Sequence, residues 1–198
     1  GANASWRGED TEDNAGASVA GGGDYNGDGS VDILIGAPAN DFWGSYSGKT
    51  YLIMFDLAPP EVLVDSTPTM ATTGDPFTFN VTVVDNFEVT NVTIEYWFGM
   101  AGKHHQGNAS RSSGGSVNGT WLLNISIPYR SDWNLNYLIH TRDVANLTNS
   151  TKARTVDVID NDKPEFLDDA TQSHATTGDA LTFIVNVTDN IEVGFVNV

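Results

Sequence analysis

The chain is 198 residues long, contains no cysteine, and carries 26 acidic against 9 basic residues, a formal net charge of −17. The absence of cysteine excludes disulfide bonds and thiol chemistry. Such a charge repels nucleic acid and anionic lipid surfaces and attracts divalent cations, so we expect no nucleic-acid partner. No run of about 18 apolar residues predicts a membrane-spanning helix, and we expect no direct membrane insertion. Because the chain opens on Gly1 rather than Met, we expect it to be a segment of a longer protein.

The first informative element is an oxygen-rich loop over residues 24–32. Oxygen-bearing side chains occupy its positions 1, 3, 5 and 9, and a glycine occupies position 6; the side chains are Asp24, Asn26, Asp28 and Asp32. Ca²⁺ takes six to eight oxygen ligands, and alternate positions of a tight loop can surround it. An EF-hand would place a glutamate at position 12 between two helices, but that position is Ile35 and no helical periodicity flanks the loop. The spacing therefore predicts a calcium loop of another kind, and the alternative is an Asp/Asn/Gly-rich turn without metal.

An apolar run follows the loop and predicts a buried strand over residues 31–35, bounded by Gly36-Ala37-Pro38. Together the segments 16–29, 32–38 and 48–53 resemble one FG-GAP repeat of the integrin alpha-subunit type. That resemblance implies one blade of a β-propeller with calcium in a hairpin loop. It also implies the ligand set, with side chains from Asp24, Asn26, Asp28 and Asp32 and the backbone carbonyl of Ser30.

Beyond Pro59-Pro60 the chain repeats itself. Residues 71–89 recur as residues 175–193, and the offset of 104 also places Pro60-Glu61 onto Pro164-Glu165. A period of about 100 residues is the size of an immunoglobulin-like sandwich. We therefore predict three domains: an FG-GAP blade over 1–57, an Ig-like β-sandwich over 58–161, and part of a second over 162–198. The arrangement resembles tandem Ig-like or PKD-like modules of prokaryotic surface proteins, and we expect an archaeal source.

Alternating apolar and polar residues predict the strands of the sandwich. The apolar face of the first strand is Phe77, Phe79, Val81 and Val83. Further strands are predicted at residues 92–97, 121–127, 137–143 and 151–159, the last with Val156 and Val158 on one face. The fold class is therefore all-β: one propeller-type blade with a calcium loop, then an Ig-like sandwich and the start of a second.

A second candidate calcium site lies at the junction of the two repeats. Residues 157–166 resemble a cadherin inter-domain linker, which is rich in Asp and Asn before a proline. In that family such linkers hold calcium between consecutive modules, and the resemblance points to Asp160 and Asp162 as ligands. The alternative is a solvated acidic turn.

Asn-x-Ser/Thr sequons are abundant and predict an N-glycosylated surface protein. Strands that alternate polar and apolar residues can also produce Asn-Val-Thr by default. Asn108 and Asn118 lie in a Gly/Ser-rich segment that we interpret as a loop, where alternation cannot explain them. The candidate sites are Asn80, Asn91, Asn108, Asn118, Asn124, Asn146, Asn149 and Asn186, with a further sequon at Asn3.

No catalytic constellation is present, and we expect no enzymatic activity. His104-His105 is interpreted as an exposed hairpin tip, since zinc would need further ligands and cysteine is absent. Four aromatic residues could line a sugar-binding face, although the sandwich core is the expected place of two of them; they are Trp97, Phe98, Trp121 and Trp133.

Three functions remain open at this stage. The first is a calcium-binding extracellular adhesion or structural protein whose partners are surface proteins, glycans or copies of itself. The second is a filament or surface-layer subunit in which a neighbouring chain supplies missing strands. The third is an accessory module of a secreted carbohydrate-active enzyme.

Overall fold

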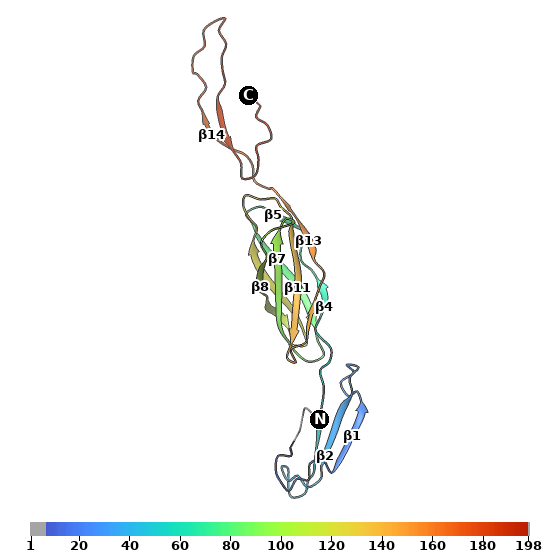
Figure 1. The fold of residues 1–198 in the computed structure, drawn as a ribbon. Helices are drawn as coiled ribbons and strands as arrows, with labels where there is room; N and C mark the ends of the chain where they lie inside the picture. The colour runs from blue at the N-terminus through green and yellow to red at the C-terminus, as the bar shows by residue number, and fades with distance from the viewer. Residues whose placement is uncertain (1–6, 198) are drawn as a thin grey trace.

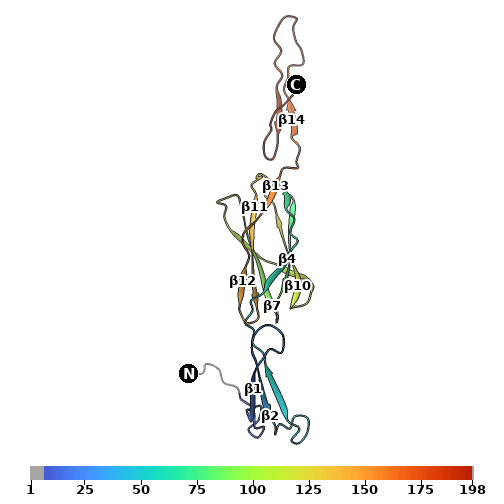
Figure 2. The same cartoon turned by 90° about the vertical axis from the view of Figure 1, so that its right-hand side faces the viewer.

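The fold is all-β, as predicted. The computed structural model describes residues 7–197, and this range contains 15 strands and no helix. In two views at right angles the strands lie in three successive groups along an elongated molecule, with the N-terminal group at one end and the C-terminal group at the other (Figures 1 and 2). Within the described residues there is accordingly no helix that could cross a membrane.

The N-terminal group is a three-stranded antiparallel sheet in the order β1-β2-β3. Its strands are β1 (Ser18–Gly23), β2 (Asp32–Ala37) and β3 (Lys49–Ile53). The prediction of a buried strand here was wrong in part. Val31 lies outside β2 and is 56% exposed, and Leu34 within β2 is 43% exposed. The run is apolar enough for a core, but no second layer of described residues covers this sheet.

The middle group is a sandwich of two sheets. The first has the order β4-β6-β10-β9, formed by β4 (Glu61–Asp65), β6 (Pro76–Val84), β10 (Asn118–Ser126) and β9 (Ser110–Gly114). The second has the order β5-β13-β11-β7-β8, and β12 pairs with β11 beside this path. Its strands are β5 (Met70–Thr72), β13 (Arg154–Ile159), β11 (Leu135–Asp143), β7 (Val89–Phe98), β8 (His105–Asn108) and β12 (Thr148–Ser150). Only the β5–β13 pair is parallel among the described pairs.

The core between the two sheets consists of the alternating residues that the sequence predicted. From β6 these are Phe77, Phe79, Val81 and Val83, and from the opposite sheet they include Ile94, Ile139, Val156 and Val158. Buried Leu135 was not predicted, because β11 begins two residues before the predicted strand. Phe79 is fully buried, with ring centroids of Phe77, Tyr96 and Tyr137 at 5.2, 5.9 and 5.0 Å. Trp121 is also buried and Phe98 packs against the core, so two of the four flagged aromatics are core residues, as expected.

The Gly/Ser-rich segment is not a loop. Its residues form β8 and β9, the first in one sheet and the second in the other, with buried Ala109 between them. Asn108 therefore ends β8, and Asn118 begins β10. The prediction failed because Gly107 has a packing role here: a Cβ at this position would lie 2.7 Å from the Leu123 side chain.

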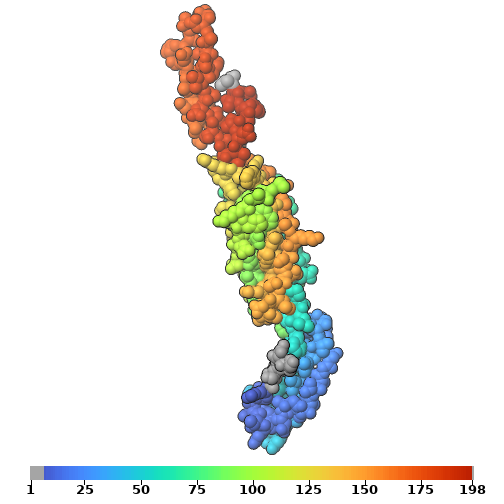
Figure 3. All heavy atoms as spheres, viewed as in Figure 1, coloured from blue at the N-terminus to red at the C-terminus, as the bar shows by residue number. Residues whose placement is uncertain are grey.

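The C-terminal group contains one antiparallel pair, β14 (Glu165–Asp169) and β15 (Val185–Thr188). Its register repeats that of β4 and β6 at the offset of 104. Glu61 pairs with Val84 and Glu165 with Thr188, and both pairs have an irregularity after their second residue. The sequence repeat is thus also a structural repeat. This group lies at the far end from the blade (Figure 3).

Candidate metal centre

The predicted calcium loop connects β1 to β2 in a tight turn. Gly23 and Asp32 are paired at its base, so the loop leaves and re-enters the sheet at neighbouring positions. Gly27 and Gly29 have φ values of 77° and 85°, a left-handed conformation that residues with a Cβ rarely adopt. These two glycines let the chain turn tightly enough for alternate side chains to face inward.

Backbone N–H groups orient the loop carboxylates. Asp24 accepts hydrogen bonds from the amides of Gly27 (2.7 Å), Asp28 (3.0 Å) and Gly29 (2.8 Å). Asp28 accepts one from the amide of Ser30 at 2.7 Å. Oδ2 of Asp24 and Oδ1 of Asp28 each accept only one of these hydrogen bonds, so each keeps a second lone pair that can bind a cation. The loop thus fixes the direction of its acidic side chains through its own backbone.

Asp28 links the loop to the sandwich. Its Oδ2 accepts hydrogen bonds from the side-chain amides of Asn26 at 2.9 Å and of Asn86 at 2.8 Å. Asn86 belongs to the connection between β6 and β7. The hydrogen bond from the Ser30 amide, aided by those from Asn26 and Asn86, holds the pKa of Asp28 below its ordinary value of 3.8. Asp28 therefore stays ionised, which a metal ligand must be.

Asp32 carries the observation that tests whether the loop fits a cation. The residue is 4% exposed, and its Oδ2 accepts a hydrogen bond from the Tyr25 amide at 2.7 Å. Its Oδ1 is buried and has no hydrogen-bond partner among the described residues. A buried carboxylate oxygen without a partner is unfavourable unless something compensates it. The donor set is all oxygen, which suits Ca²⁺.

The structure gathers the predicted ligands only in part. Asn26 and Asp28 are in direct contact, and Ser30 is buried in the loop. Within residues 7–197, however, Asp24, Asp28 and Asp32 do not form a group whose oxygens all lie within 4.8 Å of one another. A calcium ion would have to draw these carboxylates closer together.

The second predicted pair, Asp160 and Asp162, lies in the exposed connection between β13 and β14. Asp160 accepts hydrogen bonds from the Thr73 hydroxyl at 3.2 Å and from the Asp162 amide at 3.1 Å. Nearby, the Asn190 amide group donates to the Thr73 hydroxyl at 3.1 Å and to the Tyr129 carbonyl at 2.9 Å. These contacts tie the C-terminal group to the sandwich.

Sequence reasoning missed a group of three carboxylates at the other end of the sandwich. Asp56, Asp85 and Asp143 each place an oxygen within 4.8 Å of the other two, so each ionised pair repels by about 3.5 kcal/mol or more at an effective dielectric constant of about 20. Burial raises the pKa of Asp85 above its ordinary value of 3.8, and the charges of Asp56 and Asp143 raise it further. A hydrogen bond from the Phe87 amide acts in the opposite direction and lowers it. The signal that could have found the group is the repeat, because Asp56 and Asp85 recur as Asp160 and Asp189.

His104 and His105 are exposed, as predicted, but only His104 lies in the connection between β7 and β8, whereas His105 begins β8 and His140, predicted to be isolated, is half-buried and hydrogen-bonded. His104 ends the connection after β7, and its ring stacks on Trp97 with centroids 4.3 Å apart. Gln106 donates a hydrogen bond to the Glu95 carboxylate at 3.3 Å. Ring nitrogens of His140 and His104 are hydrogen-bonded to the same carboxylate at 3.1 and 2.5 Å. These hydrogen bonds lower the pKa of Glu95 to about 2, and the bond with His104 has the largest effect.

The predicted glycosylation sites divide by exposure. Asn80 and Asn91 are half-buried, and the exposed ones are Asn108, Asn118, Asn124, Asn146, Asn149 and Asn186. The sequon at Asn3 lies outside the described residues. Glycosylation at these positions stays a prediction.

Comparison with known proteins identifies one family model. Residues 15–53 match the FG-GAP repeat, which confirms the predicted repeat over β1, the acidic loop, β2 and β3. FG-GAP repeats occur in extracellular, adhesion-type proteins. No curated protein matches the chain.

Proposed function

We propose that this segment is a calcium-binding, non-catalytic structural part of an extracellular adhesion-type protein. The observation that carries the proposal is the FG-GAP repeat, whose match includes the whole acidic loop. The net charge of −17 adds support, because a crowded acidic surface gains from bound divalent cations. Calcium is the proposed cofactor, and surface proteins, glycans or copies of the same chain are the proposed partners.

In this proposal the cation stabilises the loop and, through it, the contact with the sandwich. Bound Ca²⁺ would neutralise Asp24, Asp28 and Asp32 and compensate the unpartnered Oδ1 of Asp32. Asp28 would remain the acceptor for the Asn86 amide, so ordering the loop would also order this contact. The sandwich and the following repeat, which we propose to be successive Ig-like modules, would then act as a spacer.

The test is a Ca²⁺ titration of the metal-stripped chain, monitored by two-dimensional NMR. We expect saturable shifts of the Gly27 and Gly29 amide signals at Ca²⁺ concentrations up to about 10 mM, since extracellular calcium modules bind in the range of about 0.1–1 mM. The double variant Asp24→Asn, Asp32→Asn should lose them. The exposed Asp132→Asn variant is the control and should keep them. Unchanged loop signals in the native chain would refute calcium binding here.

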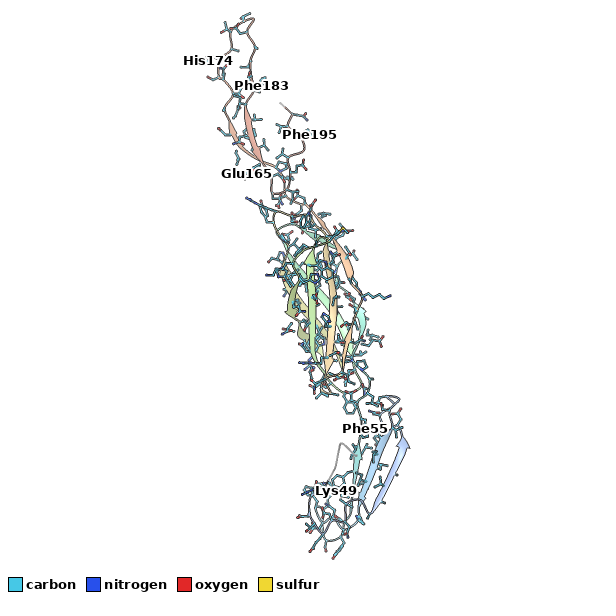
Figure 4. All side chains as sticks on the ribbon, viewed as in Figure 1. Lys49, Phe55, Glu165, His174, Phe183 and Phe195 are labelled. Atoms are coloured by element: carbon cyan, nitrogen blue, oxygen red, sulfur yellow. The ribbon has the colours of Figure 1, made fainter. Side chains whose placement is uncertain are left out.

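A second candidate function, self-association through strand pairing, is favoured by the C-terminal group. The β14–β15 pair has no other strand beside it among the described residues. Large apolar side chains are exposed around it, including Phe166 at 58%. Phe183 and Phe195, labelled in Figure 4, are 59% and 82% exposed. Unpaired strand edges next to apolar surface are sites of edge-to-edge pairing.

Sedimentation velocity over a range of concentrations tests this second candidate. We expect association that weakens in Phe183→Asp, because a charge at this position opposes burial of the surface. Ser173→Asp, an exposed change in the same group, serves as the control. A chain that stays monomeric at every concentration would exclude the filament-type role.

A further inference from the structure

The carboxylates of Asp56, Asp85 and Asp143 come from three separate segments that meet where the blade joins the sandwich. Asp56 lies in the connection between β3 and β4, Asp85 in the connection between β6 and β7, and Asp143 is the last residue of β11. Phe55, the neighbour of Asp56, marks this connection in Figure 4. The group is therefore assembled by folding and lies at a junction between two parts of the molecule.

Most oxygens of this group lack a partner. Asp143 is 1% exposed; its Oδ1 accepts the Leu147 amide at 2.8 Å, but its Oδ2 is buried and unpartnered. Oδ1 of Asp85 and both oxygens of Asp56 are also buried without partners within the described range. No lysine, arginine or histidine nitrogen of residues 7–197 lies within 4.0 Å of these three carboxylates. Buried charges in proteins are normally paired or coordinate metals.

We propose that Asp56, Asp85 and Asp143 bind one Ca²⁺ ion at this junction. Ligand atoms on opposite sides of Ca²⁺ lie about 4.6–5.2 Å apart, since Ca–O distances are about 2.3–2.6 Å. The mutual spacing of the three oxygens, within 4.8 Å, meets this requirement. All three ligands are carboxylate oxygens, a donor type that suits Ca²⁺ better than Zn²⁺. The site is distinct from the Asp24–Asp32 loop and does not depend on that loop binding calcium.

The internal repeat supports the assignment independently. At the offset of 104, Asp56 corresponds to Asp160 and Asp85 to Asp189, whereas Asp162 corresponds to Ala58. Asp85 and Asp189 each accept a hydrogen bond from the amide two residues later, at 3.1 and 3.0 Å. The same local conformation thus occurs at the start of both repeats. Asp160 rather than Asp162 is therefore the residue that belongs to the repeated acidic pattern.

The residue after each of these aspartates contacts the preceding part of the chain. The Asn86 side-chain amide donates to Asp28 of the blade, and that of Asn190 donates to Thr73 and Tyr129 of the sandwich. A cation bound by Asp85 would fix the backbone from which Asn86 reaches the blade. The proposed site would thereby couple metal binding to the geometry of the junction.

The same metal-stripped chain tests the proposal by an NMR titration with Ca²⁺ and, separately, Mg²⁺. The reporters are the amides of Phe87 and Leu147, which donate to Asp85 and Asp143. We expect saturable shifts with Ca²⁺ and at least tenfold weaker binding of Mg²⁺, whose shorter bonds of about 2.0–2.1 Å would require the carboxylates to close up. Asp143→Asn and Asp56→Asn should each lose the Phe87 response.

The two metal sites are separated by their reporters. Asp24→Asn, Asp32→Asn should abolish the Gly27 response and leave saturation of Phe87 and Leu147 intact, so either site can fail alone. Asp56 lies outside the strands, so Asp56→Asn is the variant to titrate if Asp143→Asn fails to fold. A further expectation is that Asp56→Asn melts at a higher temperature than the native chain in chelator, because one repelling charge is removed. If the Phe87 and Leu147 amide signals of the native chain do not shift when Ca²⁺ is added, the proposal is overturned.

Discussion

At the residue scale, the acidic side chains of this chain differ sharply in how they are compensated. Asp24 and Asp28 are held by backbone amides, and Asp65 accepts the Tyr137 hydroxyl at 2.7 Å and pairs with Arg154. Burial, followed by the hydrogen bond to Asp65, raises the pKa of Tyr137 to about 12, so its hydroxyl remains a donor at neutral pH. Asp85 and Asp143 each accept one backbone amide, but the other four oxygens of the group Asp56, Asp85 and Asp143 have no partner among the described residues, and none of the three carboxylates pairs with a cation there, which is why we propose that they bind a metal.

Glu95 provides a residue-scale prediction that involves no metal. Its pKa falls from 4.5 to about 2 because His104, His140 and Gln106 hydrogen-bond to the ionised form. The depressed value means that this stabilisation is present above pH 4.5 and is lost as pH falls towards about 2. Glu95→Gln should therefore unfold more easily than the native chain at pH 5, by about 1 kcal/mol at most, with no difference near pH 2.

Urea unfolding at a series of pH values measures this difference. Glu61→Gln is the matched control, an exposed glutamate on the opposite sheet, and should show no comparable pH dependence. If the difference between Glu95→Gln and the native chain were the same at pH 5 and pH 2, the assigned hydrogen bonds would not stabilise the fold.

At the element scale, the sandwich strands were predictable because their burial alternates with period two. Phe77, Phe79, Val81 and Val83 face the core from β6, as their spacing requires. The incomplete burial of β2 could not be predicted from its apolar run, because burial depends on which other parts of the chain pack against the strand. The identity of β8 and β9 was hidden for a different reason, since small residues here serve close packing of Gly107 on Leu123.

Phe79 yields the element-scale prediction. Its ring is fully buried among Phe77, Tyr96 and Tyr137, so truncation removes buried apolar contacts and leaves a cavity. Phe79→Ala should lower the free energy of unfolding of the sandwich by about 3–5 kcal/mol. Leu63→Ala, at a position 58% exposed on β4, should change it by about 0.5 kcal/mol or less.

Denaturant unfolding monitored by tryptophan fluorescence suits this comparison, because Trp121 lies in the same core. Equal losses for Phe79→Ala and Leu63→Ala would contradict the placement of β6 between the two sheets.

The two proposed metal sites differ in how much of each can be found in the sequence alone. The Asp24–Asp32 loop is local, so its spacing alone predicted the chemistry and the family match followed it. The junction group joins Asp56, Asp85 and Asp143, which are far apart in sequence. The repeat carries two of its three members, but only the sandwich topology brings the end of β11 beside them.

At the scale of the whole molecule, three groups of strands are joined by short connections and by polar contacts. Asn86 contacts the N-terminal group at Asp28, and Asn190, its counterpart in the sequence repeat, contacts the sandwich at Thr73 and Tyr129. Ca²⁺ at the first junction should restrict motion of the blade relative to the sandwich. The chain has no cysteine, so two introduced cysteines can be spin-labelled without interference.

Spin labels at Ser45→Cys in the blade and Ser113→Cys in the sandwich, both exposed positions, report on that motion. We expect the interlabel distance distribution to narrow when Ca²⁺ is added, because the bound ion removes the repulsion between the three junction carboxylates. The same labels in a chain that carries Asp143→Asn together with Asp24→Asn and Asp32→Asn should give a distribution that Ca²⁺ leaves unchanged, because both proposed sites are then removed. Equal widths with and without Ca²⁺ in the native chain would contradict a stiffened junction.

Calorimetric melting of the native chain in about 10 mM Ca²⁺ and in excess chelator tests directly whether bound calcium stabilises the fold. With a dissociation constant of about 0.1–1 mM, one bound ion stabilises the folded state by about 1.4–2.7 kcal/mol. This corresponds to a rise in melting temperature of roughly 5–20 °C for a domain of this size. The account predicts such a rise in Ca²⁺, reduced in the loop and junction variants. Superimposable melting curves in Ca²⁺ and chelator would contradict it.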